Sequence, residues 1–240
     1  MKTRRLQYAA GKVSSIGYLA WDETRNERRP GVVVFPEAFG LNDHARERAK
    51  RLARLGYVAL AADINGDGAV YNDMAQLRPI IGSLTADRAE WRARARAALD
   101  ALAGQPQVDS GRLAAIGFCF GGTTAVELAR TGAPLGAVAT FHAGLTAGLP
   151  EDAGKIRAKL LVCHGDKDPL VSKEAVDAFM TELRRDNVDW QFTYYGNAAH
   201  SFTDPAADQR NAPAFRYSKS AEDRSWASMR HLFEETFGST

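Results

Sequence analysis

The sequence of 240 residues predicts an α/β fold, a mostly parallel sheet with helices on both faces. Two observations support this prediction. Segments with strand character and segments with helical periodicity alternate along most of the chain. The segment from Gly31 to Phe35 is an apolar, β-branched run between two prolines, as expected of a strand that is buried on both faces. The first twenty residues do not follow the alternation, and we expect them to form an antiparallel edge.

Each later element has its own signal. Residues 44–55 carry alanine and leucine on one side with helical spacing, and Gly56 ends this helix. Ser172 is the predicted N-cap of a later helix that has Glu174 in its first turn. The segment 63–79 is expected to be a loop, because it opens with a cluster of Gly, Asp and Asn. The remaining predicted elements are strands at 57–62, 113–117, 137–141, 160–164 and 190–195, and helices at 87–102, 172–187, 220–237 and one ending near residue 130.

Composition and charge exclude several classes of protein. The 31 basic and 29 acidic residues leave a net charge of +2, which does not fit a dedicated nucleic-acid binder. No apolar run approaches the length of a membrane span, and the N-terminus lacks the apolar core of a secretory signal. Two cysteines without a Cys/His cluster predict neither a disulfide framework nor a metal site. We therefore expect a single cytoplasmic domain over residues 1–240, with neither nucleic acid nor membrane as a partner.

A glycine-rich turn around Cys119 is the strongest chemical signal. Gly117-Phe-Cys-Phe-Gly-Gly122 follows a predicted strand and opens a predicted helix, the context of a nucleophile elbow. The turn exposes its central side chain at a helix N-terminus, where the dipole favours a thiolate. The backbone N–H of Phe120 is then placed to stabilise an oxyanion. The alternative is a buried structural cysteine, which is the reading we favour for Cys163 within its apolar strand.

A thiol nucleophile needs a base, and the base needs an orienting acid. His200 follows the last predicted strand, and two aspartates follow the strand before it. Asp168 is favoured as the acid because it lies further into its loop, but Asp166 remains an alternative. His164 ends a strand and is expected to be structural.

The loop after the first parallel strand carries Glu37, a carboxylate on the same predicted edge of the sheet as Cys119. It could accept the thiol proton, or it could be a solvated loop residue. The N–H of Ala38 is the second oxyanion-hole candidate. The predicted substrate-binding residues are Phe39, His142 and Ser201, and a packing role for His142 is equally compatible with the sequence.

Together these residues resemble the dienelactone hydrolase, or carboxymethylenebutenolidase-like, family of α/β-hydrolases. The similarity spans nearly the whole chain. It is carried by Glu37 to Asn42, Gly56 to Asp63, Gly117 to Gly122, Gly165-x-x-Asp168, His200-Ser201-Phe202 and Asp223 to Trp226. The resemblance implies an α/β-hydrolase fold, a Cys119-Asp168-His200 triad, a thiol-proton role for Glu37 and lactone hydrolysis without a cofactor.

One position departs from the family pattern. Family members carry an arginine four residues after the catalytic histidine that helps to hold a substrate carboxylate, and here that position is Asp204. An acid there would repel an anionic substrate, so we expect a neutral ester or lactone unless Arg78, Arg88 or Arg210 compensates. The alternatives are a promiscuous arylesterase or phosphotriesterase on the same triad, a thiol redox sensor, and a non-catalytic binding module. The sequence leaves a monomer and a homodimer open.

Overall fold

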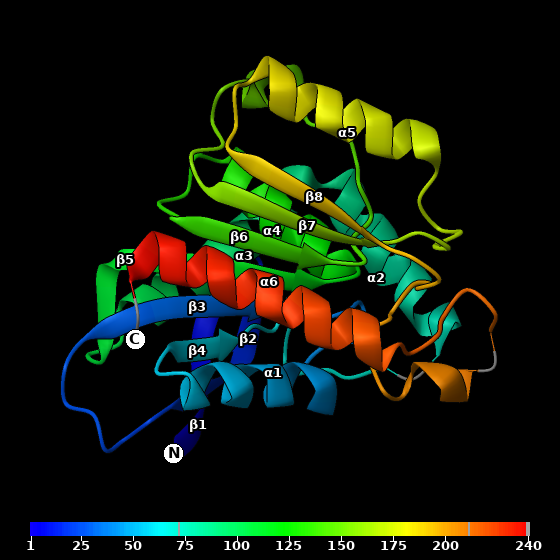
Figure 1. Cartoon of the computed structure of the whole chain (residues 1–240). Helices are drawn as coiled ribbons and strands as arrows, with labels where there is room; N and C mark the ends of the chain where they lie inside the picture. Colours follow the sequence, from blue (N-terminus) through cyan, green and yellow to red (C-terminus); the bar gives the residue numbers. More distant parts are fainter. Residues whose placement is uncertain (72, 211, 239–240) are drawn as a thin grey trace. The chain divides into compact units, whose positions relative to one another are not determined.

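The structure is a computed structural model that describes residues 1–71, 73–210 and 212–238 (Figure 1). Its internal contacts divide the chain into two compact units, and the chain passes from the first to the second at Ile116 and Gly117. Each unit consists of strands covered by helices, as expected of an α/β chain. Among the described residues, no helix combines the length and the apolar character needed to cross a bilayer.

The first unit contains four strands in the order β1-β2-β4-β3. The N-terminal strands pair antiparallel with each other, and β2 pairs antiparallel with β4, which confirms the predicted edge. β3 and β4 run parallel, with Val32 opposite Ala59. Every residue of β3 is buried, as its β-branched run predicts. The strands are β1 (Lys2–Ala10), β2 (Val13–Trp21), β3 (Arg29–Phe35) and β4 (Val58–Ala61), and most of β5 (Val108–Phe118) also belongs to this unit.

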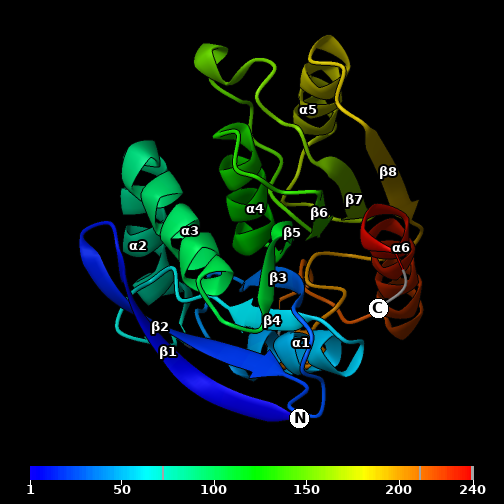
Figure 2. The same cartoon turned by 90° about the vertical axis from the view of Figure 1, so that its left-hand side faces the viewer.

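Three helices complete the first unit: α1 (Asp43–Arg54), α2 (Met74–Ala86) and α3 (Arg88–Ala103). Figures 1 and 2 show α1 on one face of these strands and α3 on the other. The prediction of a loop over 63–79 is wrong from residue 74 on, because α2 begins there; residue 72 lies outside the described residues. Asp73 caps α2 by accepting a hydrogen bond from the N–H of Ala75 (2.9 Å), and the helix includes Pro79.

The second unit contains the parallel strands β6 (Ala137–Phe141), β7 (Lys159–Gly165) and β8 (Trp190–Tyr195). Phe141 lies opposite Cys163, which lies opposite Thr193. The helices α4 (Phe120–Arg130) and α6 (Lys219–Phe237) cover these strands from opposite sides (Figure 1), and α5 (Lys173–Arg185) precedes β8. Two 3-10 turns, η1 (Pro150–Asp152) and η2 (Ala207–Arg210), lie in the connecting loops. The predicted parallel strands and flanking helices of this half of the chain are therefore confirmed.

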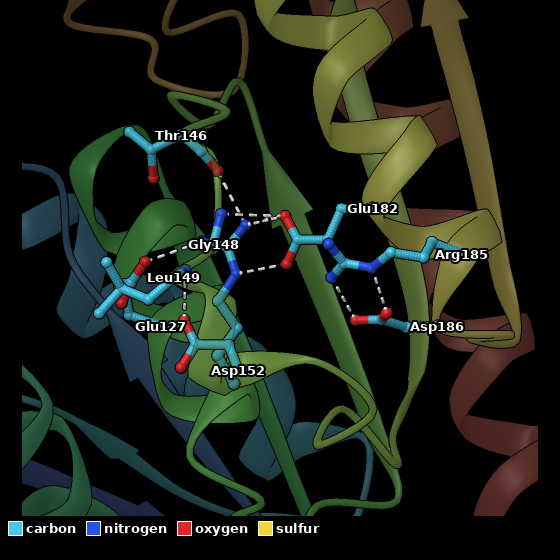
Figure 3. Close-up of polar contacts among 9 residues, drawn as sticks. Glu127, Thr146, Gly148, Leu149, Asp152, Glu182, Arg185 and Asp186 are labelled. Atoms are coloured by element: carbon cyan, nitrogen blue, oxygen red, sulfur yellow. Dashed lines mark hydrogen bonds and ion pairs between the residues drawn. The ribbon is translucent and has the colours of Figure 1, made fainter.

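A fully buried arginine cluster ties three segments of the second unit together (Figure 3). Arg130, at the end of α4, donates to Glu127 (2.7 Å), to both carboxylate oxygens of Glu182 on α5 (2.9 and 2.7 Å) and to the carbonyl of Thr146 (2.8 Å). The N–H of Gly148 also donates to Glu182 (3.1 Å). These contacts satisfy the guanidinium in a place where water cannot, so each partner depends on the others.

Candidate active site

The turn that carries Cys119 has the strained geometry expected of a nucleophile elbow. Cys119 has φ 53° and ψ −121°, a backbone conformation that residues other than glycine rarely adopt. A Cβ on Gly117 would lie 2.0 Å from the carbonyl oxygen of Gly121, and one on Gly122 would lie 2.6 Å from the Cβ of Ala143. The flanking glycines are therefore required by close packing between the strand end and the helix start.

The two cysteines occupy different environments. Cys119 is partly exposed, and its N–H donates to the carbonyl of Phe141 (3.0 Å). Cys163 is buried within β7, and burial raises the pKa of its thiol to about 12. The hydroxyl of Tyr195 donates to the Cys163 sulfur at 3.7 Å. Cys163 therefore has the environment of an inert core thiol, whereas Cys119 is accessible at a helix N-terminus.

Phe120 is the first residue of α4. In the first turn of this helix, the N–H groups of Gly122 and Thr123 donate to the carbonyl of Cys119 (2.9 and 3.3 Å). The oxyanion-hole role of the Phe120 N–H stays a prediction from the sequence.

Asp168 and His200 form a buried pair. Oδ2 of Asp168 lies 2.7 Å from Nδ1 of His200, and Oδ1 accepts the N–H of Leu170 (2.9 Å). Of the two aspartates that the sequence left open, Asp166 is exposed, while Asp168 contacts the histidine. The aspartate fixes the tautomer of His200 and leaves Nε2 as its reactive nitrogen.

The electrostatics of His200 favour its charged form. Burial alone lowers the pKa of His200, but the negative charge of the Cys119 sulfur and the hydrogen bond to Asp168 outweigh burial and raise the pKa from 6.5 to about 10. Nε2 forms no hydrogen bond of good geometry within the described part of the chain, yet the Cys119 sulfur is close enough to act on it. The Cys119 sulfur and Asp168 therefore both favour the protonated form of His200.

His142 lies against the imidazole of His200 with a ring-centroid distance of 5.3 Å. It is fully buried. Its backbone N–H donates to the carbonyl of Cys163 (2.9 Å), and its ring Nε2 lies 2.8 Å from Oγ1 of Thr203. The ring of Phe215 packs edge-on to His200 at 5.5 Å. Of the two roles that the sequence left open for His142, these contacts are those of a packing residue beside His200.

Ser201 is also fully buried, and its hydroxyl accepts a hydrogen bond from Nη1 of Arg210 (2.9 Å). The same guanidinium pairs through Nη2 with Asp204. Of the three compensating arginines that the sequence suggests, Arg210 thus neutralises Asp204, while Arg78 and Arg88 lie on helices of the first unit. Arg210 therefore offsets the predicted repulsion by Asp204, and the expectation of a neutral substrate stays a prediction.

The loop of the first unit that follows β3 is firmly held. Glu37 is only 2% exposed, which excludes the solvated-loop alternative. Its carbonyl accepts the N–H of Gly40 (3.0 Å), the carbonyl of Ala38 accepts from the side chain of Asn65 (3.1 Å), and that of Phe39 accepts the N–H of Tyr71 (2.9 Å). Phe39 is half-buried. These residues lie on one ordered segment next to the 63–71 loop.

Sequence reasoning missed Thr203 and Phe215, and it named Arg210 only as one of three arginines that could compensate for Asp204. Thr203 lies three residues after His200, but nothing in a linear pattern indicates that its hydroxyl meets a histidine 61 positions earlier. Among the described residues, no group of three or more His, Cys, Asp or Glu side chains lies close enough together to hold a metal ion.

Comparison with known proteins identifies the family of this chain. The Dienelactone hydrolase family profile matches residues 16–237. A solved structure named m3DLH is 65% identical, with a TM-score of 0.97 and 98% of each chain covered. The dienelactone hydrolase-like promiscuous phosphotriesterase P91, from metagenomic libraries, is 57% identical, with a TM-score of 0.97 and 99% of each chain covered. A putative carboxymethylenebutenolidase of Escherichia coli K12 is 29% identical over 87% of this chain and 78% of its own length.

The strand and helix order, the profile match and the near-identical folds of these structures lead to one conclusion. The chain has the α/β-hydrolase fold and belongs to the dienelactone hydrolase family of carboxylic ester and lactone hydrolases.

Proposed function

We propose that this enzyme cleaves an ester or lactone through a thioester on Cys119, with His200 as acid and base and Asp168 as the orienting acid. The observation that carries the proposal is the 2.7 Å Asp168–His200 contact, made by a histidine whose proton affinity is raised by the Cys119 sulfur. The partly exposed elbow supports the same assignment. Because Cys119 is partly exposed at this turn, a substrate can reach it.

The reaction follows from these positions. The thiolate of Cys119 attacks the carbonyl carbon, and the N–H of Phe120 stabilises the oxyanion, a contribution of about 3 kcal/mol for one donor. The imidazolium of His200 gives its proton to the leaving alkoxide, so the carbon–oxygen bond breaks and a thioester remains. Neutral His200 then takes a proton from water, whose oxygen attacks the thioester. The acid departs, and the thiolate–imidazolium pair is restored. The roles predicted for Glu37, Ala38 and Phe39 stay predictions from the sequence.

The thioester can be tested directly. We expect p-nitrophenyl acetate, quenched in acid within a few turnovers, to leave an acetyl group on the peptide that contains Cys119, because thioesters survive acid. Mass spectrometry of the digested protein checks this, and protein alkylated with iodoacetamide is the control. An acetyl group found only on another residue would refute Cys119 as the nucleophile.

The charge of His200 gives a pH prediction. Because its pKa is raised to about 10, we expect ring carbon signals in NMR spectra to report imidazolium at pH 8, where an ordinary histidine is neutral. The stability from this raised pKa is fully present below about 6.5 and is lost as the pH rises through about 10. In Cys119→Ala the negative sulfur is gone, so His200 should titrate at a lower pH. An unchanged titration in that variant would contradict the ion pair.

The contact between His142 and Thr203 predicts a positioning role. Thr203→Val keeps the shape but removes the hydroxyl that holds His142 against His200, so we expect kcat to fall about tenfold with little change in KM. Thr203→Ser restores the hydroxyl and should restore kcat. The pH profile of kcat should also shift in the valine variant alone. Equal losses in the serine and valine variants would indicate a packing effect instead.

Phosphotriester hydrolysis is a second candidate activity. The observation that favours it is the 57% identity, over 99% of the chain, to a structure described as a promiscuous phosphotriesterase. Absence of paraoxon turnover by wild-type enzyme that hydrolyses aryl esters would dismiss it. The thiol redox sensor gains less support, because the other cysteine, Cys163, is buried in the core.

A further inference from the structure

A cavity of about 310 Å³ lies within the first unit. It is formed where the β1–β2 hairpin meets α1, two elements that Figure 2 labels. The lining residues are Arg5, Ile16, Gly17, Tyr18, Leu41, Arg46 and Gly68. This volume is near the lower end of the range for ligand sites, so it suits a small molecule.

The side-chain donors that line this cavity make few hydrogen bonds or ion pairs with the described residues. Arg5 and Tyr18 stand opposite each other across the hairpin, so their side chains share one face. Neither side chain forms a hydrogen bond or ion pair with the residues described in the structure. Arg46 pairs with Asp43 at 3.3 Å, but that carboxylate is 99% exposed and gives a weak, solvated contact.

The charged side chains that line the cavity are both positive. Among the described residues that line the cavity, two are arginines and none is an aspartate or glutamate. The nearby carboxylate of Asp63 accepts the backbone N–H groups of Ile16 (2.9 Å) and Gly68 (2.7 Å). Gly68 lies beside one of the two arginines, because a Cβ there would be in van der Waals contact with Nη2 of Arg5 (3.9 Å). A guanidinium binds carboxylate or phosphate oxygens through two parallel hydrogen bonds, and a phenol adds a third donor. Ile16 and Leu41 offer an apolar wall for the rest of a ligand.

We propose that this cavity is a binding site for a small organic oxyanion, a carboxylate or a phosphate ester with a short apolar group. The site does not depend on the chemistry of Cys119. One of its walls, Leu41, follows directly on Gly40, which pairs with Val70 in an isolated β-bridge. A ligand in the cavity would therefore contact the loop segment that begins at Glu37.

Binding can be measured by titration calorimetry at low ionic strength, with inorganic phosphate in one series and butyrate in another. We expect saturable one-to-one binding of at least one of the two anions, and the ratio of the two dissociation constants gives the preference of the site. Arg5→Gln and Arg46→Gln should each weaken binding about tenfold or more, because each removes a charged hydrogen-bond donor. Circular dichroism checks that these variants fold.

Arg4→Gln is the matched control. Arg4 is the neighbour of Arg5 on the other face of β1, where it donates to Gln105, and it does not line the cavity. It should bind as the wild type does. The proposal is overturned if neither anion gives saturable binding, if Arg4→Gln loses as much affinity as Arg5→Gln, or if binding survives both lining variants and so occurs elsewhere.

Discussion

Replacing Cys119 with alanine is expected to lower the rate of ester hydrolysis by about four orders of magnitude or more, because no other group can form the acyl intermediate. The loss should be in kcat, since the elbow backbone and the N–H of Phe120 remain. Serine at the same position keeps an attacking oxygen. It is nevertheless expected to be much slower, because a hydroxyl is a weaker acid and a weaker nucleophile than a thiol.

The measurement is steady-state hydrolysis of p-nitrophenyl acetate by wild type and variant. Cys163→Ala is the control, because it removes the buried thiol and leaves the accessible one. We expect that control to keep its activity, provided that it folds. If Cys119→Ala hydrolysed the ester at a rate close to that of wild type, another residue would have to be the nucleophile.

Replacing Arg130 with methionine is expected to lower the free energy of unfolding by about 3–5 kcal/mol. The substitution leaves the carboxylates of Glu127 and Glu182 buried without their cation, and it deprives the Thr146 carbonyl of its donor. Little of this loss comes from shape, because methionine fills much of the volume of the arginine side chain.

Urea unfolding of the two proteins measures this difference, and α3 offers a matched control. Arg96 also donates to a carboxylate, that of Asp100 (2.8 Å), but both side chains are exposed, by 49% and 57%. Arg96→Met should therefore cost no more than about 1 kcal/mol. If both variants lost the same stability, burial of the Arg130 cluster would have no energetic consequence.

The sequence predicts the fold where local and global signals agree. The β3 run is apolar throughout because the strand is buried on both faces, and the glycines around Cys119 report a turn that admits no other side chain. The prediction fails at α2, whose Asp and Asn neighbours resemble a loop and whose Pro79 argues against a helix. β5 begins at Val108, five residues before the predicted strand, because Asp109 to Gly111 give its start a polar, turn-like character.

The residues of the candidate site also differ in how far the sequence could predict them. Cys119 and His200 could be predicted because each follows a strand within a recognisable motif. The partner of Thr203, and which of three arginines pairs with Asp204, could not be predicted, because both depend on how the segment after β8 folds back. The sign of the charge at Asp204 was readable from the sequence, but its neutralisation depends on a side chain six residues away.

The backbone at Cys119 also sets a trade between stability and chemistry. Glycine would occupy that conformation without strain, whereas a residue with a Cβ bears a cost of about 1–3 kcal/mol. Glycine at this position would therefore favour the folded state but would remove the thiol from the helix N-terminus. The chain gives up some folding stability in order to hold a reactive side chain at this turn.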